Sequence, residues 1–565
     1  MTPPSAAAEI RETPPAAHGA GSRKAAAGCI SEGIGLQARV HRWCSISAVD
    51  SLPESFNAAA FFVDRHLREG RADRAAFRFE GRPVTYGELA DLVARAAGAL
   101  AEAGLDVEQR VLLVLDDTPA FAAAFWGAAK LGAVAVPVNT LMAAEEYAFL
   151  LEDSRARVVV VEASAAPRLL AARGDSPWLR AVFVVGARVP GIADWDEALA
   201  RARPMEHAAR TVAEDIVYWG YTSGSTGRPK AAVHSHADFL AAAELVGVGV
   251  FGIVPDDLVF SASKLYFAFG LGNAGYFPAH AGAASVLIPE RITAEGALAV
   301  IDRERPTLFF AVPTLYARML EVPDAERRFD VSSLRFAVSS GEALPPPIFD
   351  AWADRFGVEL VEVVGSTEAL HDFIANRPGQ ARRGCAGRLV PGFDARLVDD
   401  HGAPVPDGAV GHLLIKGPTT SPYYWNRRER TRRTMLGEWL RTGDMFRRDA
   451  DGWFYFEGRS DDMLKIAGQW VSPAEVEAHL AAHPAVLEAG VVGATDARGL
   501  TVPQAHVVLK AGRAASTALA EELRAFVRGR AAAFKAPAAV EFVAELPKTA
   551  TGKIQRFRLR GAARP

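Results

Sequence analysis

YTSGSTGRPK, residues 221–230, combines hydroxyl side chains, two glycines and a terminal lysine directly after the apolar run DIVYWGY. The apolar run predicts a buried strand. Glycines and small residues let backbone N–H groups turn towards an anion, and the hydroxyl groups add further donors. The stretch is not a Walker A loop, because Ala231, and not Ser or Thr, follows Lys230. Its chemistry predicts a phosphate-binding loop at the end of a strand.

Helical and extended patterns alternate on both sides of this loop. VTYGELADLVARAAGALAEAG (84–104) predicts a helix with a capping box formed by Thr85 and Glu88. RVLLVL (110–115) is a short apolar run that suits a buried parallel strand, and VELVEVVG (358–365) repeats the pattern further along. Alternation of this kind predicts an α/β fold, in which helices cover a parallel sheet.

The pattern changes towards the C-terminus. From about residue 384, short strands and many Gly and Pro residues predict a β-rich subdomain. A last α+β segment begins near Asp461, and there Ser472 caps a helix that starts at Pro473. We therefore expect a large N-terminal region of stacked α/β sheets plus a β-rich subdomain, followed by a small α+β domain. The predicted division is a disordered Ala/Pro-rich leader (1–52), an N-terminal domain (53–460) and a C-terminal domain (461–565).

Composition excludes several classes of protein. Half of the 565 residues are apolar, which rules out a wholly disordered chain. Lys and Arg number 63 and Asp and Glu 67, so no basic surplus marks a nucleic-acid or anionic-membrane partner. No apolar run reaches the roughly 18 residues of a membrane helix. Three cysteines, Cys29, Cys44 and Cys385, form no disulfide framework, so we predict reduced thiols and a cytoplasmic location.

Two other strings suggest chemistry without further support. GVGVFG (247–252) matches G-x-G-x-x-G, but it follows a helical pattern and not a strand, so a dinucleotide site is not expected. His234 and Asp238 match an acyltransferase-like H-x-x-x-D string, yet no second motif accompanies them. We expect His234 to pack beside the phosphate-binding loop.

Five motifs in one order resemble the signature set of the adenylate-forming superfamily, which includes acyl-CoA synthetases, firefly luciferase and the adenylation domains of peptide synthetases. They are YTSGSTGRPK (221–230), GSTE (365–368), LRTGD (440–444), GRSDD (458–462) and PKTATGK (547–553). The resemblance extends from about residue 55 to the end of the chain. It implies that ATP and a carboxylate react to an acyl-adenylate and diphosphate, while Mg²⁺ and positive side chains neutralise the like charges.

The resemblance also implies roles for single residues. Glu368 would bind Mg²⁺, Thr367 would donate to the α-phosphate, and Asp444 would accept hydrogen bonds from the ribose hydroxyls. Lys553 would bridge the attacking carboxylate and the α-phosphate, a role worth on the order of 10² to 10³ in rate. The residues implied for ATP binding are Thr222, Ser223, Gly224, Ser225, Thr226, Gly227, Lys230, Gly341, Glu342, Ala343, Gly365, Ser366, Thr367, Asp444, Arg459 and Lys553.

The C-terminal segment resembles a mobile lid. Asp461 matches the family's hinge, about which the lid domain swings between adenylation and thioester formation. Lys465 and Gly468 would then face the pantetheine arm of coenzyme A. Gly468 suits such a place, because no side chain there can intrude on a narrow tunnel.

A narrower resemblance is to the benzoate and aryl-CoA ligases. It rests on SASKLYFAFGLGNA (261–274), SSGEALP (339–345), GSTEALH (365–371), YYWN (423–426) and RSDDMLKIAGQWVSP (459–473). It implies an apolar, flat-sided acid pocket, where ring faces bind an arene by burial and stacking. The residues implied for this pocket are Phe267, Ala268, Phe269, Gly341, Val364 and His371.

The implied activity is that of an acid–CoA ligase. It would activate a benzoate-like acid with ATP and then form the CoA thioester, releasing AMP and diphosphate. Its partners would be the acid, ATP and coenzyme A, and a homodimer is left open. Three alternatives are the loading of a separate carrier protein, a non-aromatic acid substrate, and a non-catalytic nucleotide-binding regulator. The intact set of charged motif residues argues against the last of these.

Three residues depart from the family pattern. Ala231 stands where many members have Gly, and it would cost on the order of 1 kcal/mol if the backbone there were left-handed. Val364 stands where an aromatic residue often stacks on adenine. Asp372 follows His371 where a benzoate ligase is expected to have an apolar residue. We expect Asp372 to face outward, although an inward carboxylate could accept a hydrogen bond from a ring hydroxyl or amino group.

Overall fold

The computed structural model describes most of the chain. The described residues are 55–174, 176–224, 227–466, 469–496, 500–548 and 554–562. The predicted leader (1–52) lies outside them, as do Ser225, Thr226, Gly468 and Lys553 of the predicted site. No helix within the described ranges is long and apolar enough to cross a membrane.

A seven-stranded sheet carries the strand that precedes the predicted phosphate-binding loop. In spatial order its strands are β7 (Ala193–Asp194), β6 (Ala181–Val185), β5 (Val158–Glu162), β3 (Arg110–Val114), β4 (Val134–Pro137), β8 (Ile216–Gly224) and β9 (Gly227–Ser235). Neighbouring strands are parallel up to β8, and β9 returns antiparallel to β8. The strand predicted at 110–115 is confirmed as β3.

Helices connect these strands and those of the next sheet. The α-helices are α2 (Arg65–Arg68), α3 (Tyr86–Glu102), α4 (Pro119–Leu131), α5 (Ala144–Ser154), α6 (Ala166–Ala172), α7 (Trp195–Arg201), α8 (His236–Ala242), α9 (Ala268–Gly270), α10 (Phe277–Ala281), α11 (Ala294–Glu304), α12 (Pro313–Leu320), α13 (Ala325–Arg328), α14 (Pro346–Phe356) and α15 (Arg428–Thr434). Helix α3 confirms the prediction for 84–104, because the Thr85 hydroxyl accepts from the Glu88 N–H and the Glu88 carboxylate accepts from the Thr85 N–H.

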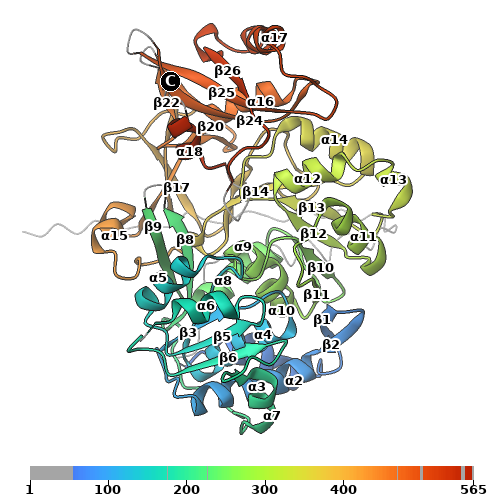
Figure 1. Cartoon of the computed structure of the whole chain (residues 1–565), viewed down its shortest axis with the longest axis vertical. Helices are drawn as coiled ribbons and strands as arrows, with labels where there is room; N and C mark the ends of the chain where they lie inside the picture. The colour runs from blue at the N-terminus through green and yellow to red at the C-terminus, as the bar shows by residue number, and fades with distance from the viewer. Residues whose placement is uncertain are drawn as a thin grey trace, which may run out of the picture. The chain divides into compact units, whose positions relative to one another are not determined.

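Both faces of the seven-stranded sheet are buried. Val111 and Leu113 of β3 belong to one apolar cluster with residues of α3 and α4. Leu112 and Val114 belong to a second cluster, with residues of α5 and α6. Figure 1 shows these helices around β3, β5 and β6. A strand covered on both faces requires a continuous apolar run, which is the physical reason for the RVLLVL pattern.

A nine-stranded sheet forms the second α/β layer. In spatial order its strands are β16 (Arg388–Leu389), β15 (Asp372–Ala375), β14 (Leu360–Gly365), β13 (Phe336–Ser339), β12 (Leu308–Ala311), β10 (Leu258–Ser261), β11 (Ala284–Leu287), β1 (Ala75–Phe79) and β2 (Arg82–Thr85). The strands from β14 to β1 are parallel, so their carboxyl ends meet at one edge. Ligands of open α/β sheets bind at such an edge.

Short irregular helices accompany this sheet. They are the π-helices η2 (Ala60–Asp64), η3 (Ala243–Val248) and η4 (Leu271–Tyr276) and the 3₁₀ segment η5 (Thr367–Ala369). The GVGVFG string starts within η3, directly after α8, so it follows a helix as predicted. Single-turn π-helices are rare in proteins, but those that occur often lie at functional sites. Here η4 directly follows α9 of the predicted acid-binding segment.

The remaining sheets are antiparallel for the most part. The β-rich subdomain contains β17 (Asp394–Val398), β18 (Val410–Lys416), β20 (Trp439–Arg448), β19 (Met435–Leu436) and β21 (Phe454–Arg459). The C-terminal segment contains β22 (Leu464–Ile466), β23 (Gln469–Val471), α16 (Pro473–Ala481), β24 (Val486–Thr495), β25 (Thr501–Leu509), α17 (Thr517–Arg528), the 3₁₀ segment η6 (Ala533–Lys535), β26 (Ala539–Phe542) and α18 (Arg556–Ala562). The Ser472 hydroxyl caps α16, as predicted. The division at 460/461 stays a prediction.

A buried carboxyl group on β14 makes folding depend on pH. The Glu362 side chain accepts a hydrogen bond from the Leu344 N–H over 2.9 Å. Burial raises the pKa of Glu362 from 4.5 to about 8, against the opposing effect of this hydrogen bond. Its contribution to stability is therefore complete below pH 4.5 and is lost as the pH rises through 8.

Replacing Glu362 with Gln should remove this dependence. The amide has nearly the same shape and never ionises, so we expect the variant to have a higher Tm than the wild type at pH 9, by roughly 2 °C or more. The difference should shrink at pH 5, where the wild-type group is protonated. Thermal unfolding at both pH values measures this, with Glu152→Gln on the exposed face of α5 as the control. Equal differences at both pH values would contradict the prediction.

Candidate active site

The described residues of the predicted phosphate-binding stretch lie in β8 and β9, which pair antiparallel, and not in the strand-to-helix turn of a Walker loop. Thr222 is paired with Lys230 across these two strands, so the lysine returns to the base of the loop. Ala231 is paired with Tyr221 in ordinary strand conformation, and the backbone strain considered for this alanine does not arise.

Lys230 meets an acidic and a phenolic side chain from distant parts of the chain. Its Nζ donates to Glu368 Oε1 over 2.9 Å and to the Tyr424 hydroxyl over 2.5 Å. The Tyr424 hydroxyl in turn donates to Glu368 Oε1 over 2.7 Å. The Lys230 and Glu368 side chains are only 13% and 15% exposed. Two predicted site residues of opposite charge are thus brought together, and Tyr424 contacts both.

Glu368 is ionised at any ordinary pH. Burial alone would raise the pKa of its carboxyl group, but the Lys230 charge and the hydrogen bonds from Tyr424 and Lys230 outweigh burial and lower the pKa to about 2. An ionised carboxylate only accepts hydrogen bonds or coordinates cations.

This carboxylate fits a magnesium site of the nucleotide-binding kind. Mg²⁺ is usually held by one or two carboxylates together with waters and substrate phosphates. Among the described residues, no group of three or more His, Cys, Asp or Glu side chains could cage a metal ion. Glu368 would therefore be the protein's ligand, and phosphate oxygens would complete the coordination.

Buried contacts fix the loop that carries Thr367 and Glu368 against β8 and β9. His234 of β9 forms hydrogen bonds through Nε2 to the Thr367 carbonyl oxygen and through Nδ1 to Asp238, both over 2.8 Å. A Cβ atom on Gly220 would lie 2.5 Å from Thr367 Cγ2, so glycine is needed where β8 approaches this loop. His234 packs near the phosphate-binding stretch, as predicted, and its spacing from Asp238 is explained by a local hydrogen bond.

Two further predicted ATP-binding segments lie at the carboxyl edge of the nine-stranded sheet. Gly341, Glu342 and Ala343 follow β13, and Gly365 ends the neighbouring strand β14 and is followed by Ser366. Gly341 has φ +90°, a left-handed conformation that favours glycine. Parallel pairing therefore places both segments at the same edge. Val364, predicted to line the acid pocket, is half-buried against the apolar core.

Four of the residues predicted to bind the acid come from two segments that touch. Phe267 precedes α9, and Ala268 and Phe269 lie in it. His371 follows η5, and its Nε2 lies 3.3 Å from the Phe269 carbonyl oxygen. The His371 ring centroid is 5.5 Å from that of Phe269 and 4.5 Å from that of Phe277. Aromatic walls and a histidine thus converge beside the GSTE loop.

Asp444 and Arg459, both predicted to bind ATP, are partners in the structure. They are paired across β20 and β21, and Arg459 Nη1 donates to Asp444 Oδ1 over 2.7 Å. The Asp444 charge raises the pKa of Arg459 further above its ordinary value. A nucleotide ribose would meet a carboxylate that is already oriented by an arginine.

The predicted hinge lies beside the last helix. Asp461 is exposed, and its carbonyl oxygen accepts from Arg560 of α18 over 3.0 Å. Asp462 accepts from Arg556 over 3.4 Å and from Arg560 over 2.5 Å. The backbone of Lys465 lies in β22. The roles of Asp461, Lys465, Gly468 and Lys553 stay predictions.

The expectation that Asp372 faces outward is wrong. Asp372 is 2% exposed and His371 3% exposed, although adjacent strand residues usually point to opposite faces. Leu370, immediately before them, has φ +62° and ψ −44°, a conformation rarely adopted by a non-glycine residue. All four residues of β15, Asp372–Ala375, are buried, so this strand is covered on both faces and offers Asp372 no solvent face.

Two residues of the site are absent from the predicted site residues. Tyr424 stands in YYWN, and its backbone forms a bridge with Ala232 of β9, which carries its hydroxyl to Lys230. Gly220 is an ordinary strand glycine by pattern, and only the contact with Thr367 reveals its function. The motif resemblance at 423–426 is the signal that could have singled out Tyr424.

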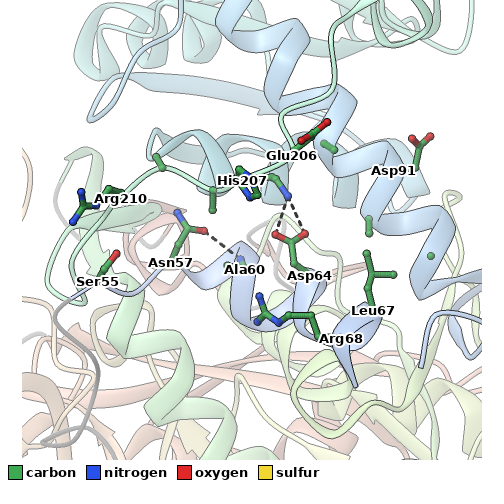
Figure 2. Close-up of a pocket in the computed structure, with 16 residues that line it drawn as sticks. Ser55, Asn57, Ala60, Asp64, Leu67, Arg68, Asp91, Glu206, His207 and Arg210 are labelled. Carbon is green, nitrogen blue, oxygen red and sulfur yellow. Dashed lines mark hydrogen bonds and ion pairs between the residues drawn. The ribbon is translucent and has the colours of Figure 1, made fainter. Parts of the chain in front are cut away.

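A pocket of about 610 Å³ lies elsewhere and contains none of the predicted site residues. Figure 2 shows Asp64 pointing into it, and the dashed lines mark the contacts of Asp64 with Lys130 at 2.8 and 2.9 Å. The Lys130 side chain is 2% exposed, so its charge is balanced within the protein. We interpret this pair as part of the scaffold.

Comparison with known proteins agrees with this geometry. The AMP-binding enzyme family matches residues 63–425, and the AMP-binding enzyme C-terminal domain matches residues 475–553. The chain belongs to the AMP-binding enzyme family.

Particular relatives within this family act on aromatic acids. The chain is 44% identical to a 4-hydroxybenzoate–CoA/benzoate–CoA ligase of Rhodopseudomonas palustris, over 89% of this chain and 94% of that protein. It is 43% identical to a benzoate–CoA ligase of Thauera aromatica, over 90% and 97%. A crystal structure of an anthranilate CoA ligase in complex with anthranoyl-AMP has a TM-score of 0.88 and 40% identity, over 91% of this chain and 98% of that chain.

Replacing Glu368 with Gln should destabilise the protein at pH 7 by roughly 3 kcal/mol, because the buried Lys230 charge loses its carboxylate. The pKa of Glu368 falls on folding from 4.5 to about 2, so its contribution is complete above pH 4.5 and is lost as the pH falls through 2. Thermal unfolding of the two proteins should differ clearly at pH 7 and much less at pH 3.

The double variant Lys230→Met/Glu368→Gln is the matched control. It removes both charges, so it should recover part of the lost Tm at pH 7. A single variant as stable as the wild type at pH 7 would show that the pair is not a net stabilising contact.

Proposed function

We propose that the protein is an ATP-dependent, AMP-forming acid–CoA ligase for an aromatic carboxylic acid. The observation that supports this most directly is the Lys230–Glu368–Tyr424 cluster beside the carboxyl edge of β14, next to the aromatic segment at Phe269 and His371. A cation, an ionised carboxylate and aromatic walls are the groups that suit the transfer of AMP from ATP to an aryl acid, with diphosphate as the leaving group.

In the first half-reaction a carboxylate oxygen attacks the α-phosphorus of ATP, and diphosphate leaves. Lys230 would exchange its contact with Glu368 for phosphate oxygens, and this leaves Glu368 free to hold Mg²⁺. Magnesium, when bound, would supply positive charge to the phosphates. Asp444 would orient the ribose, and Lys553 would neutralise the reacting oxygens.

In the second half-reaction the CoA sulfur attacks the acyl carbon, and AMP leaves. The predicted hinge at Asp461 would carry the C-terminal domain from one half-reaction to the other, with Lys465 and Gly468 towards the pantetheine arm. Asp462, directly after this hinge, accepts hydrogen bonds from Arg556 and Arg560 of α18. Helix α18 would therefore move together with the segment that follows the hinge.

Aromatic acids are proposed as substrates on two grounds. His371 contacts the rings of Phe269 and Phe277, which can hold a flat arene by burial and stacking. The relatives described above act on benzoate and 4-hydroxybenzoate, and one structural neighbour holds anthranoyl-AMP. A homodimer and a cytoplasmic location stay predictions.

Diphosphate release and thioester formation test the proposal separately. With ATP, Mg²⁺ and benzoate or a substituted benzoate, we expect diphosphate release, and with coenzyme A we expect an aryl-CoA product by mass spectrometry. A pantetheinylated carrier protein offered in place of coenzyme A should remain unloaded. Transfer to the carrier but not to coenzyme A would replace the ligase by an adenylating enzyme, and a preference for aliphatic acids would overturn the aromatic assignment.

Replacing Lys553 with Ala should lower the rate of diphosphate release by on the order of 10² or more, because the reacting anions lose their counter-charge. Lys535→Ala is the matched control, since Lys535 pairs with Glu475 in the same C-terminal segment. Its rate should stay close to that of the wild type. Unchanged release by the Lys553 variant would refute the role proposed for this lysine.

A further inference from the structure

Several buried polar atoms near the predicted acid site lack a hydrogen-bond partner among the described residues, including Asn273 Nδ2 and Oδ1 and Ser366 Oγ. Three others are the Tyr276 hydroxyl, His371 Nδ1 and Asp372 Oδ2. Their side chains belong to residues that are 0%, 3% and 2% exposed. Most buried polar groups in proteins have a partner, and an exception calls for an explanation such as a functional role.

The three atoms come from two elements that meet. Tyr276 ends η4, whose Gly272 approaches the His371 ring so closely that a Cβ there would overlap the ring, and that Cβ would lie 3.1 Å from the Tyr276 hydroxyl. His371 Nδ1 is 2.9 Å from Asp372 Oδ2, but the two atoms are not aligned for a hydrogen bond. Asp372 also lies within electrostatic reach of Tyr276.

The Asp372 carboxyl group borders the proposed active site. Asp372 starts β15 and is paired with Gly365, the first residue of the GSTE motif. A Cβ on Gly365 would lie 2.6 Å from Asp372 Oδ1, so this glycine makes room for the carboxyl group. The neighbouring His371 ring is in contact with Phe269 of the acid-binding segment. The Asp372 carboxyl group therefore adjoins the GSTE motif, and its neighbour His371 adjoins the aromatic segment.

We infer that Asp372, assisted by the Tyr276 hydroxyl, binds a hydrogen-bond donor on the ring of the substrate. The substrate class is then hydroxy- or amino-substituted benzoic acids, and unsubstituted benzoate is a poor substrate. This inference rests on the proposed function and assigns the substrate of that same site.

The chemistry of the two groups supports selectivity. A carboxyl oxygen accepts hydrogen bonds, so a C–H edge of benzoate or a methyl group cannot satisfy it, whereas a phenol or aniline can donate to it. The tyrosine hydroxyl can accept or donate and suits either substituent. A site built around a substrate hydroxyl or amino group rejects the analogue without it far more strongly than an apolar site rejects a missing methylene, because its polar atoms are left unpaired.

The test compares substituents of similar size. Diphosphate release is measured for hydroxy-, amino- and methylbenzoates at each ring position, and for benzoate. We expect kcat/KM for the best donor-bearing acid to exceed that for its methyl counterpart by at least about 100-fold. The panel also decides between hydroxyl and amino groups. Equal use of the methyl compound would overturn the inference and leave the proposed ligase intact, whereas no release with any acid would overturn both.

Substitutions then locate the selectivity. Asp372→Leu should shift the ratio of kcat/KM towards the methyl compound by about 10- to 100-fold, as the loss of a hydrogen bond to a charged group predicts. Tyr276→Phe should shift it in the same direction by about 3- to 10-fold. Asp91→Leu, on the exposed surface of α3, is the control and should leave the ratio unchanged.

A folding defect would not obscure this result. The ratio compares two substrates on the same preparation, so a partly unfolded sample changes both rates equally. Asp372→Asn keeps the shape of the side chain and can still accept through its carbonyl oxygen, so it should retain part of the preference. An Asp372→Leu or Asp372→Asn enzyme with the wild-type ratio would overturn the assignment of Asp372.

Discussion

The buried contact between Lys230 and Glu368 joins residues 138 positions apart and holds the site together. Removing one charge from water is expensive unless an opposite charge and further hydrogen bonds compensate it, and here Tyr424 supplies those hydrogen bonds to both partners. The contact fixes β9 against the turn after β14. In the ligase reaction the same two groups would separate, the lysine towards phosphate and the carboxylate towards magnesium. Before the nucleotide and magnesium bind, the Lys230 and Glu368 charges therefore balance each other.

Much of the fold is predictable, because its determinants are local. The α3 capping box involves residues three apart, and the run at β3 is apolar because helices cover both faces of the sheet. The meeting of the Gly341 and Gly365 segments also follows, since parallel strands put their carboxyl ends at one edge. The motifs therefore predict which segments lie close together in space as well as the chemistry of those segments. The roles of the individual residues stay predictions.

The rest depends on contacts that no local pattern encodes. Tyr424 reaches Lys230 only because its segment pairs with β9, almost 200 residues earlier in the chain. Asp372 is buried because both faces of β15 are covered, so every residue of this strand is buried. A polar residue in a strand pattern is normally assigned to the solvent face, and this strand has no such face.

Glu368 and Asp372 lie four residues apart, and their carboxyl groups have different hydrogen-bond partners in the structure. Glu368 receives hydrogen bonds from a lysine and a tyrosine, and its charge is balanced within the protein. Asp372 is at least as deeply buried, but its Oδ2 faces His371 Nδ1 at 2.9 Å without a hydrogen bond, and the nearby Tyr276 hydroxyl has no partner among the described residues. Both carboxyl groups are largely shielded from solvent, so the difference lies in which partner each carboxyl group has. For Glu368 the chain itself provides that partner; for Asp372 a donor on the aromatic acid is the one that the proposed chemistry brings to this place.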